Sequence, residues 1–177
     1  MIEIENWVEL KDISDEAKHY LLKQLYANTL LWNELVRHFK KYIVHEDKVI
    51  FTYSSILAFI KYVKNNYALG EDVSLDIMKD TVKRFYYTMS YLFTSNTIES
   101  KSPILFKDNV SIYNPLYISK ESFVFSGIDG IDGILYLNNI SIYLPADMVV
   151  PVEHTGLKLH YVVDEENKTE TFSLTFI

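Results

Sequence analysis

The chain has 177 residues, of which 49% are hydrophobic and 15% aromatic, and its formal net charge at pH 7 is −7. This composition is sufficient for a packed core and excludes a disordered chain. The sequence contains no cysteine, which excludes disulfides, thiolate zinc sites, iron–sulfur clusters and cysteine nucleophiles.

The charge is unevenly distributed along the chain. Residues 1–94 contain 12 basic and 13 acidic side chains, whereas residues 95–177 contain 5 basic and 11 acidic ones. An acidic surface repels phosphate groups at long range. Any contact with nucleic acid therefore requires a local basic patch, and the first part of the chain is the place for it.

The chain opens with alternating apolar and polar residues over 2–10, which predicts a β-strand. Glu3, Glu5 and Glu9 interrupt the apolar residues, so this segment does not have the pattern of a secretory signal. No apolar run approaches the roughly 20 residues that a membrane-spanning helix needs. We therefore expect a cytoplasmic protein without a membrane segment.

Three helices are predicted next, because apolar residues then recur every three or four positions. The predicted helices occupy roughly residues 14–44, 54–66 and 74–93. Ser14 and Ser74 are expected to cap the first and third helices, since serine is a favoured cap and acidic residues follow in the first turn, Asp15 and Glu16 in one and Asp76 in the other. Asn28 falls within the apolar stripe of the first helix, so its side chain needs a polar partner if it is buried.

Beyond about Ile104 the apolar residues alternate instead and are separated by turn-forming residues, which predicts many short strands. The predicted strands are 104–106, 109–113, 116–119, 122–126, 133–137, 140–144, 157–163 and 170–177. The first strand is expected to pair with these later ones. The predicted fold is therefore α+β, with a small antiparallel β-barrel formed by residues 1–11 and 98–177 and a three-helix insertion over residues 12–97.

No catalytic pattern is evident. The sequence contains no Gly-x-Ser-x-Gly signature and no pair of histidines at the i, i+4 spacing of metal ligands. The segment Gly127–Gly133 holds two carboxylates, too few for a calcium loop, and strand-like residues follow it where a phosphate loop would open a helix. We expect a glycine-rich turn there, and a protein that is not an enzyme and uses no metal or cofactor.

Basic residues on the predicted helices are the candidate nucleic-acid-binding residues. The set is Arg37, Lys40, Lys41, Lys61, Lys64, Lys83 and Arg84, with Tyr87 and Tyr91 near the last two. One interpretation is a phosphate-binding patch. The other is that the helix dipole favours lysine near the end of any helix, and the sequence leaves both interpretations open.

Several segments carry a resemblance to a known family. They are Val8–Lys11, Ser14–Lys23, Tyr26–Asn33, Leu75–Tyr86, Pro103–Lys107, Val110–Tyr113 and the final hairpin. In order and spacing they resemble the N-terminal half of TnpB (OrfB-type) proteins, the transposon-encoded RNA-guided nucleases related to type V CRISPR effectors. The resemblance implies a wedge-like barrel with inserted recognition helices that together hold a guide RNA and its target. The chain stops where the RuvC nuclease of that family would begin, so no nuclease activity is implied.

Two functions follow as expectations. The first is a non-catalytic module that binds RNA or DNA, as the guide-binding half of TnpB-like proteins does. The alternative is an acidic protein-interaction module, encoded by a virus or mobile element, that inhibits or regulates a nucleic-acid enzyme. The acidic strand half suggests the alternative, because carboxylates can occupy a basic groove of a partner protein.

Overall fold

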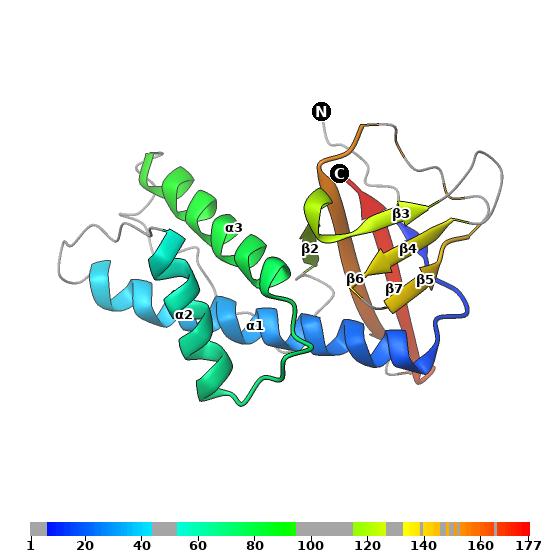
Figure 1. Cartoon of the computed structure of the whole chain (residues 1–177), viewed down its shortest axis with the longest axis horizontal. Coiled ribbons are helices and arrows are strands. Elements are labelled where there is room, and N and C mark those ends of the chain that lie inside the picture. The colour runs from blue at the N-terminus through cyan, green and yellow to red at the C-terminus, as the bar shows by residue number, and fades with distance from the viewer. Residues whose placement is uncertain are drawn as a thin grey trace. The chain divides into compact units, whose positions relative to one another are not determined.

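The computed structural model describes residues 7–43, 53–94, 115–126, 133–138, 140–145, 148, 151, 153–164 and 166–177. In chain order its elements are β1 (Val8–Glu9), α1 (Asp15–Ile43), α2 (Tyr53–Asn66), α3 (Leu75–Thr94), β2 (Leu116–Ser119), β3 (Val124–Ser126), β4 (Ile134–Leu137), β5 (Ile140–Tyr143), β6 (Gly156–Asp164) and β7 (Thr169–Phe176). The described part is mixed α+β with antiparallel sheets, as predicted (Figure 1).

The chain divides into two compact units. Met1–Leu25 and Val110–Ile177 form what we call the strand unit, and Tyr26–Asn109 form the helical unit. The boundary falls inside α1, so the first turns of this helix belong to the strand unit. The sequence of the strand unit contains 6 basic and 15 acidic side chains, a net charge of −9, whereas that of the helical unit contains 11 and 9, a net charge of +2.

The predicted starts of α1 and α3 are confirmed by their caps. The backbone N–H of Ala17 donates to Ser14 Oγ over 3.2 Å, and that of Ile77 donates to Ser74 Oγ over 3.4 Å. Each serine thus satisfies a donor that would otherwise lack a partner in the first turn of its helix. At the end of α2, Ala68 adopts a left-handed conformation with φ of 50° and the N–H of Leu69 returns to the carbonyl of Lys64, which closes the helix.

The helical unit has its own apolar core. The buried residues of this core are Ala27, Leu31, Leu35, Val36, Ile60, Val63, Val73, Met78, Val82 and Phe85. Trp32 of α1 meets Phe85 of α3 edge to face, with ring centroids 5.1 Å apart. The polar partner that Asn28 requires is Thr81, whose hydroxyl donates to Asn28 Oδ1 over 2.6 Å in a buried contact between α1 and α3.

The strand unit contains a four-stranded antiparallel sheet with the order β1–β7–β6–β2. Val8 pairs with Leu174, and the N–H of Leu10 donates to the carbonyl of Phe172 over 2.8 Å. The expected pairing of the first strand with the C-terminal strands is therefore confirmed for the residues that the structure describes. The hairpin of β6 and β7 is the longest pairing of the sheet and runs from Leu157 opposite Phe176 to Asp164 opposite Thr169.

A second, three-stranded sheet has the order β3–β4–β5. It faces the first sheet, and Phe176 of β7 contacts the rings of Phe123 and Phe125 at centroid distances of 6.2 and 6.4 Å. The start of α1 contacts both sheets, because Lys18 forms an ion pair with Glu170 and the Tyr20 hydroxyl accepts a 2.7 Å hydrogen bond from the Asn138 side chain.

The predicted barrel is not supported, because neither sheet closes on itself within the described residues. A closed barrel needs strands long enough to tilt and stagger around a common axis. Here β3, β4 and β5 have only three or four residues each, and a 3₁₀ turn, Lys120–Ser122, takes the place of the start of the strand predicted over 122–126. The strands predicted over 104–106 and 109–113 lie outside the described residues, as do residues 127–132 of the glycine-rich turn that was expected over 127–133.

The contact between Asn28 and Thr81 yields a stability prediction. Thr81→Val keeps the shape of the side chain but removes the donor, which leaves the buried Asn28 oxygen without this hydrogen bond. We expect the free energy of unfolding to fall by about 1–3 kcal/mol in urea denaturation. Thr88→Val, on the exposed side of the same helix, should change it by less than about 0.5 kcal/mol. Equal effects of the two substitutions would show that the contact does not stabilise the helical unit.

Candidate nucleic-acid interface

The seven predicted basic residues all lie on the three helices of the helical unit. Arg37, Lys40 and Lys41 are on α1, Lys61 and Lys64 on α2, and Lys83 and Arg84 on α3. The side chains of Lys40 and Lys41 lie outside the part of the chain that the structure describes.

Arg37 belongs to a polar network that links α1 to the loop after α2. Its guanidinium forms an ion pair with Glu34 and donates to the Tyr67 hydroxyl over 3.2 Å, while that hydroxyl donates to Glu34 Oε1 over 2.6 Å. The hydrogen bond to Glu34 raises the pKa of Tyr67, and the contacts with Tyr67 and Glu34 raise the pKa of Arg37. Because the carboxylate already neutralises much of the Arg37 charge, this residue is a weakened phosphate ligand.

The other basic residues differ in their exposure to solvent and in the contacts that they already make, and both affect how well they could bind a phosphate. Lys64 donates to the backbone carbonyl of Val73 over 3.3 Å, so it supports the loop before α3. Lys83 is 62% exposed and its ammonium lies 4.0 Å from Asp80 Oδ1, a loose ion pair that solvent screens. Lys61 is exposed and Arg84 is partly exposed.

Exposed tyrosines accompany these basic residues. Tyr62 follows Lys61 directly and is 46% exposed, and Tyr87, one turn after Lys83 on α3, is 70% exposed. Tyr86 is also exposed and its ring contacts that of Tyr87 with a centroid distance of 6.2 Å. Base stacking on tyrosine next to a cation is the usual chemistry of single-strand recognition.

Tyr87 was predicted from the sequence to lie near the basic residues, whereas Tyr62 and Tyr86 were not. The chain contains 14 tyrosines, and tyrosine occurs both in cores and on surfaces, so its presence alone predicts little. The usable signal for Tyr62 was its place directly after a lysine on the polar side of α2. Its ring is positioned by Phe59 and His38, whose centroids lie 6.0 and 6.3 Å away.

Two histidines of the strand unit, His154 and His160, have aromatic partners. Trp7 stacks on His160 with a distance of 3.5 Å between the ring centroids. The pKa of His160 is lowered, mainly by its partial burial and to a lesser extent by the charge of Lys158. His154 lies against Phe123 and Phe176. Among the described residues, no three His, Asp or Glu side chains are arranged to hold a metal ion.

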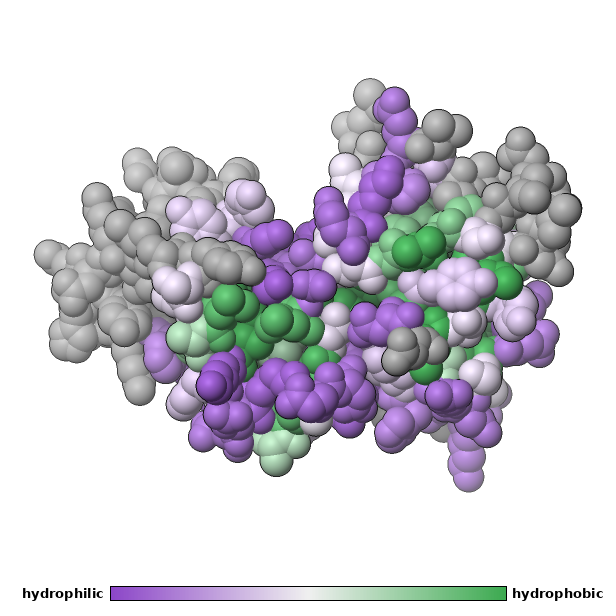
Figure 2. All heavy atoms as spheres, viewed as in Figure 1, coloured by the Kyte–Doolittle hydropathy of each residue, from purple (hydrophilic) through white to green (hydrophobic). Residues whose placement is uncertain are grey.

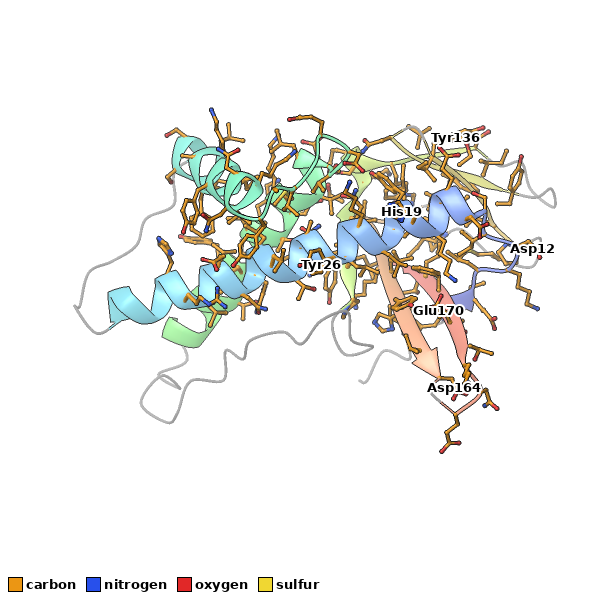
Figure 3. The ribbon with its side chains drawn as sticks, turned by 90° about the horizontal axis from the view of Figure 1, so that it is seen from below. Asp12, His19, Tyr26, Tyr136, Asp164 and Glu170 are labelled. Atoms are coloured by element: carbon orange, nitrogen blue, oxygen red, sulfur yellow. The ribbon has the colours of Figure 1, made fainter. Side chains whose placement is uncertain are left out.

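A shallow pocket of about 430 Å³ lies on the strand unit beside the β6–β7 hairpin. It is lined by Lys18, Val163, Asp164, Lys168 and Glu170; Figure 3 shows Asp164 and Glu170 along the hairpin. Two cations and two carboxylates balance one another here, and Lys18 already forms an ion pair with Glu170. The hydrogen bonds from Lys18 and Tyr161 lower the pKa of Glu170. The pocket therefore offers no net charge to an ionic ligand.

Tyr161 of the same hairpin makes the stability of the fold depend on pH in the alkaline range. Burial and the hydrogen bond to Glu170 raise the pKa of Tyr161 from 10.0 to about 12. Between pH 10 and pH 12 the unfolded chain releases the Tyr161 proton, whereas the folded chain retains it. The contribution of Tyr161 to stability is therefore fully present below pH 10 and is lost as the pH rises toward 12. In Tyr161→Phe, this fall should be shallower by up to about 1.4 kcal/mol per pH unit. Urea titrations across this pH range measure it, and identical slopes for both proteins would refute this account.

No protein-family model matches the chain, and no curated protein matches it. Each helix that the structure describes is too short or too polar to span the hydrocarbon core of a membrane.

Proposed function

We propose that the chain is a non-catalytic, cytoplasmic nucleic-acid-binding protein that holds single-stranded RNA or DNA on its helical unit. The observation that carries the proposal is the set of exposed tyrosines beside exposed cations. Tyr62 adjoins Lys61 on α2, and Tyr87 lies one turn from Lys83 on α3.

Charge and stacking favour the helical unit over the strand unit as the binding surface. The helical unit has a net charge of +2, whereas the strand unit has a net charge of −9 and repels phosphates. A net charge of +2 is small, so stacking on tyrosine has to contribute a large share of the affinity. Stacking tolerates any base, and we therefore expect binding with little sequence preference.

We also propose that the chain is related to the guide- and target-binding half of transposon-encoded TnpB-type proteins. The order of the elements supports this relation: a first strand, three helices, and then strands of which the last pairs with the first. The proposal needs no nuclease activity.

Replacing the most exposed tyrosine tests the stacking. Tyr87→Ala should weaken binding of fluorescein-labelled oligouridine or oligothymidine by about 1–3 kcal/mol, measured by fluorescence anisotropy. Tyr143→Ala is the matched control, because Tyr143 is similarly accessible but lies on the acidic strand unit. It should bind like the wild type. The proposal fails if the wild type shows no salt-sensitive binding of either oligonucleotide at micromolar protein, or if the two variants bind equally.

Replacing an exposed lysine tests the phosphate contact separately. Removing one phosphate contact to a single strand should reduce the slope of log affinity against log salt concentration by about 0.7. We expect this change for Lys61→Ala and no change for Lys168→Ala, at the hairpin tip of the strand unit. Anisotropy titrations over a series of sodium chloride concentrations give both slopes. An unaltered slope for Lys61→Ala would show that Lys61 does not contact a phosphate of the bound nucleic acid.

A further inference from the structure

The three-stranded sheet of the strand unit has an uncharged outer face. The strand register places Val124, Tyr136 and Ser141 in one row across the sheet and Ser126, Ile134 and Tyr143 in the next. The opposite face carries Leu135, Leu137 and Ile142, which are buried. We call the six outward residues the tyrosine–serine face.

Large apolar side chains on this face are open to solvent. Val124 is 65% exposed and Tyr143 is 63% exposed, while Ile134 and Tyr136 are partly exposed. Figure 2 shows pale and green residues over β3, β4 and β5, and Figure 3 shows Tyr136 on the side of β4 that faces away from β6 and β7. Apolar and aromatic side chains that are exposed next to one another on one face are typical of a protein-interaction surface.

The composition of the face is that of a protein contact. The centres of protein interfaces are depleted of charged residues and enriched in tyrosine. Tyrosine gives a large contact area at a low entropy cost, and serine adapts its hydrogen bonds to the partner. A nucleic acid would require a cation, and none of the six residues provides one.

The net charge of the strand unit, which carries this face, restricts what can cover the face. The strand unit carries 15 acidic and 6 basic side chains, and a second copy of the chain would bring two net charges of −9 together. Self-association through this face is thus opposed by repulsion between the two copies. A partner whose contact surface is apolar and surrounded by Lys and Arg gains both burial and attraction.

We propose that the tyrosine–serine face docks a partner protein with an apolar contact surface that is surrounded by basic side chains. This inference goes beyond the proposed nucleic-acid binding, because it concerns the other unit and a different class of macromolecule. The two proposals can fail independently.

Site-specific photo-crosslinking identifies the occupant. A benzoylphenylalanine at position 143 of the full chain should crosslink one protein in extract of the source cells, and the same group at Glu166, on the hairpin tip away from the face, should not. The captured protein, identified by mass spectrometry, is then purified. Equal crosslinking at both positions, a crosslink between two copies of this chain, or a captured protein with an acidic contact surface would overturn the proposal.

Affinity measurements on the purified partner complete the test. The double substitution Val124→Lys with Tyr143→Lys should weaken binding at least about tenfold, and binding of the wild type should weaken as salt concentration rises. Tyr87→Ala should bind the partner normally. Both substituted side chains are mostly exposed, so the variant should retain its fold, which circular dichroism checks. Unchanged affinity of the folded double variant would overturn the proposal.

Discussion

The pairing of β1 with β7 is the contact on which the architecture depends. Val8 and Leu174 are partners in one sheet although almost the whole chain separates them. Closing so long a loop has an entropic cost, although this cost grows slowly with loop length. The hydrogen bonds of β1 and the apolar contacts of the sheet must offset it. Because of this pairing, α1, α2 and α3 form an insertion between the first strand and the later strands of the chain.

Local features of the fold were predictable because local chemistry determines them. Ser14 and Ser74 are followed by acidic residues and cap their helices as expected, and the need of Asn28 for a partner followed from its place in an apolar stripe. The partner itself, Thr81, was not predictable, because it lies on another helix. The β6–β7 hairpin was predictable from alternation on both sides of a polar turn.

The division of the strands into two sheets was not predictable from alternation. A period of two residues shows that a strand has a buried side, but it does not identify the neighbouring strand.

The candidate site was predictable only as a set of cations. Arg37 and Lys83 each have an acidic residue three positions earlier, Glu34 and Asp80. The prediction did not take this i, i+3 spacing into account, and the spacing explains why their charges are partly compensated.

The stacking of Trp7 on His160 gives this tryptophan different surroundings from those of the other tryptophan, Trp32. The chain contains only these two indoles. Trp7 belongs to the strand unit and lies on an imidazole, whereas Trp32 belongs to the helical unit and lies against a phenyl ring. Each unit therefore contains one tryptophan, and the two indoles lie in different chemical environments. Emission from single-tryptophan variants can report separately whether each half of the molecule melts, without any attached dye.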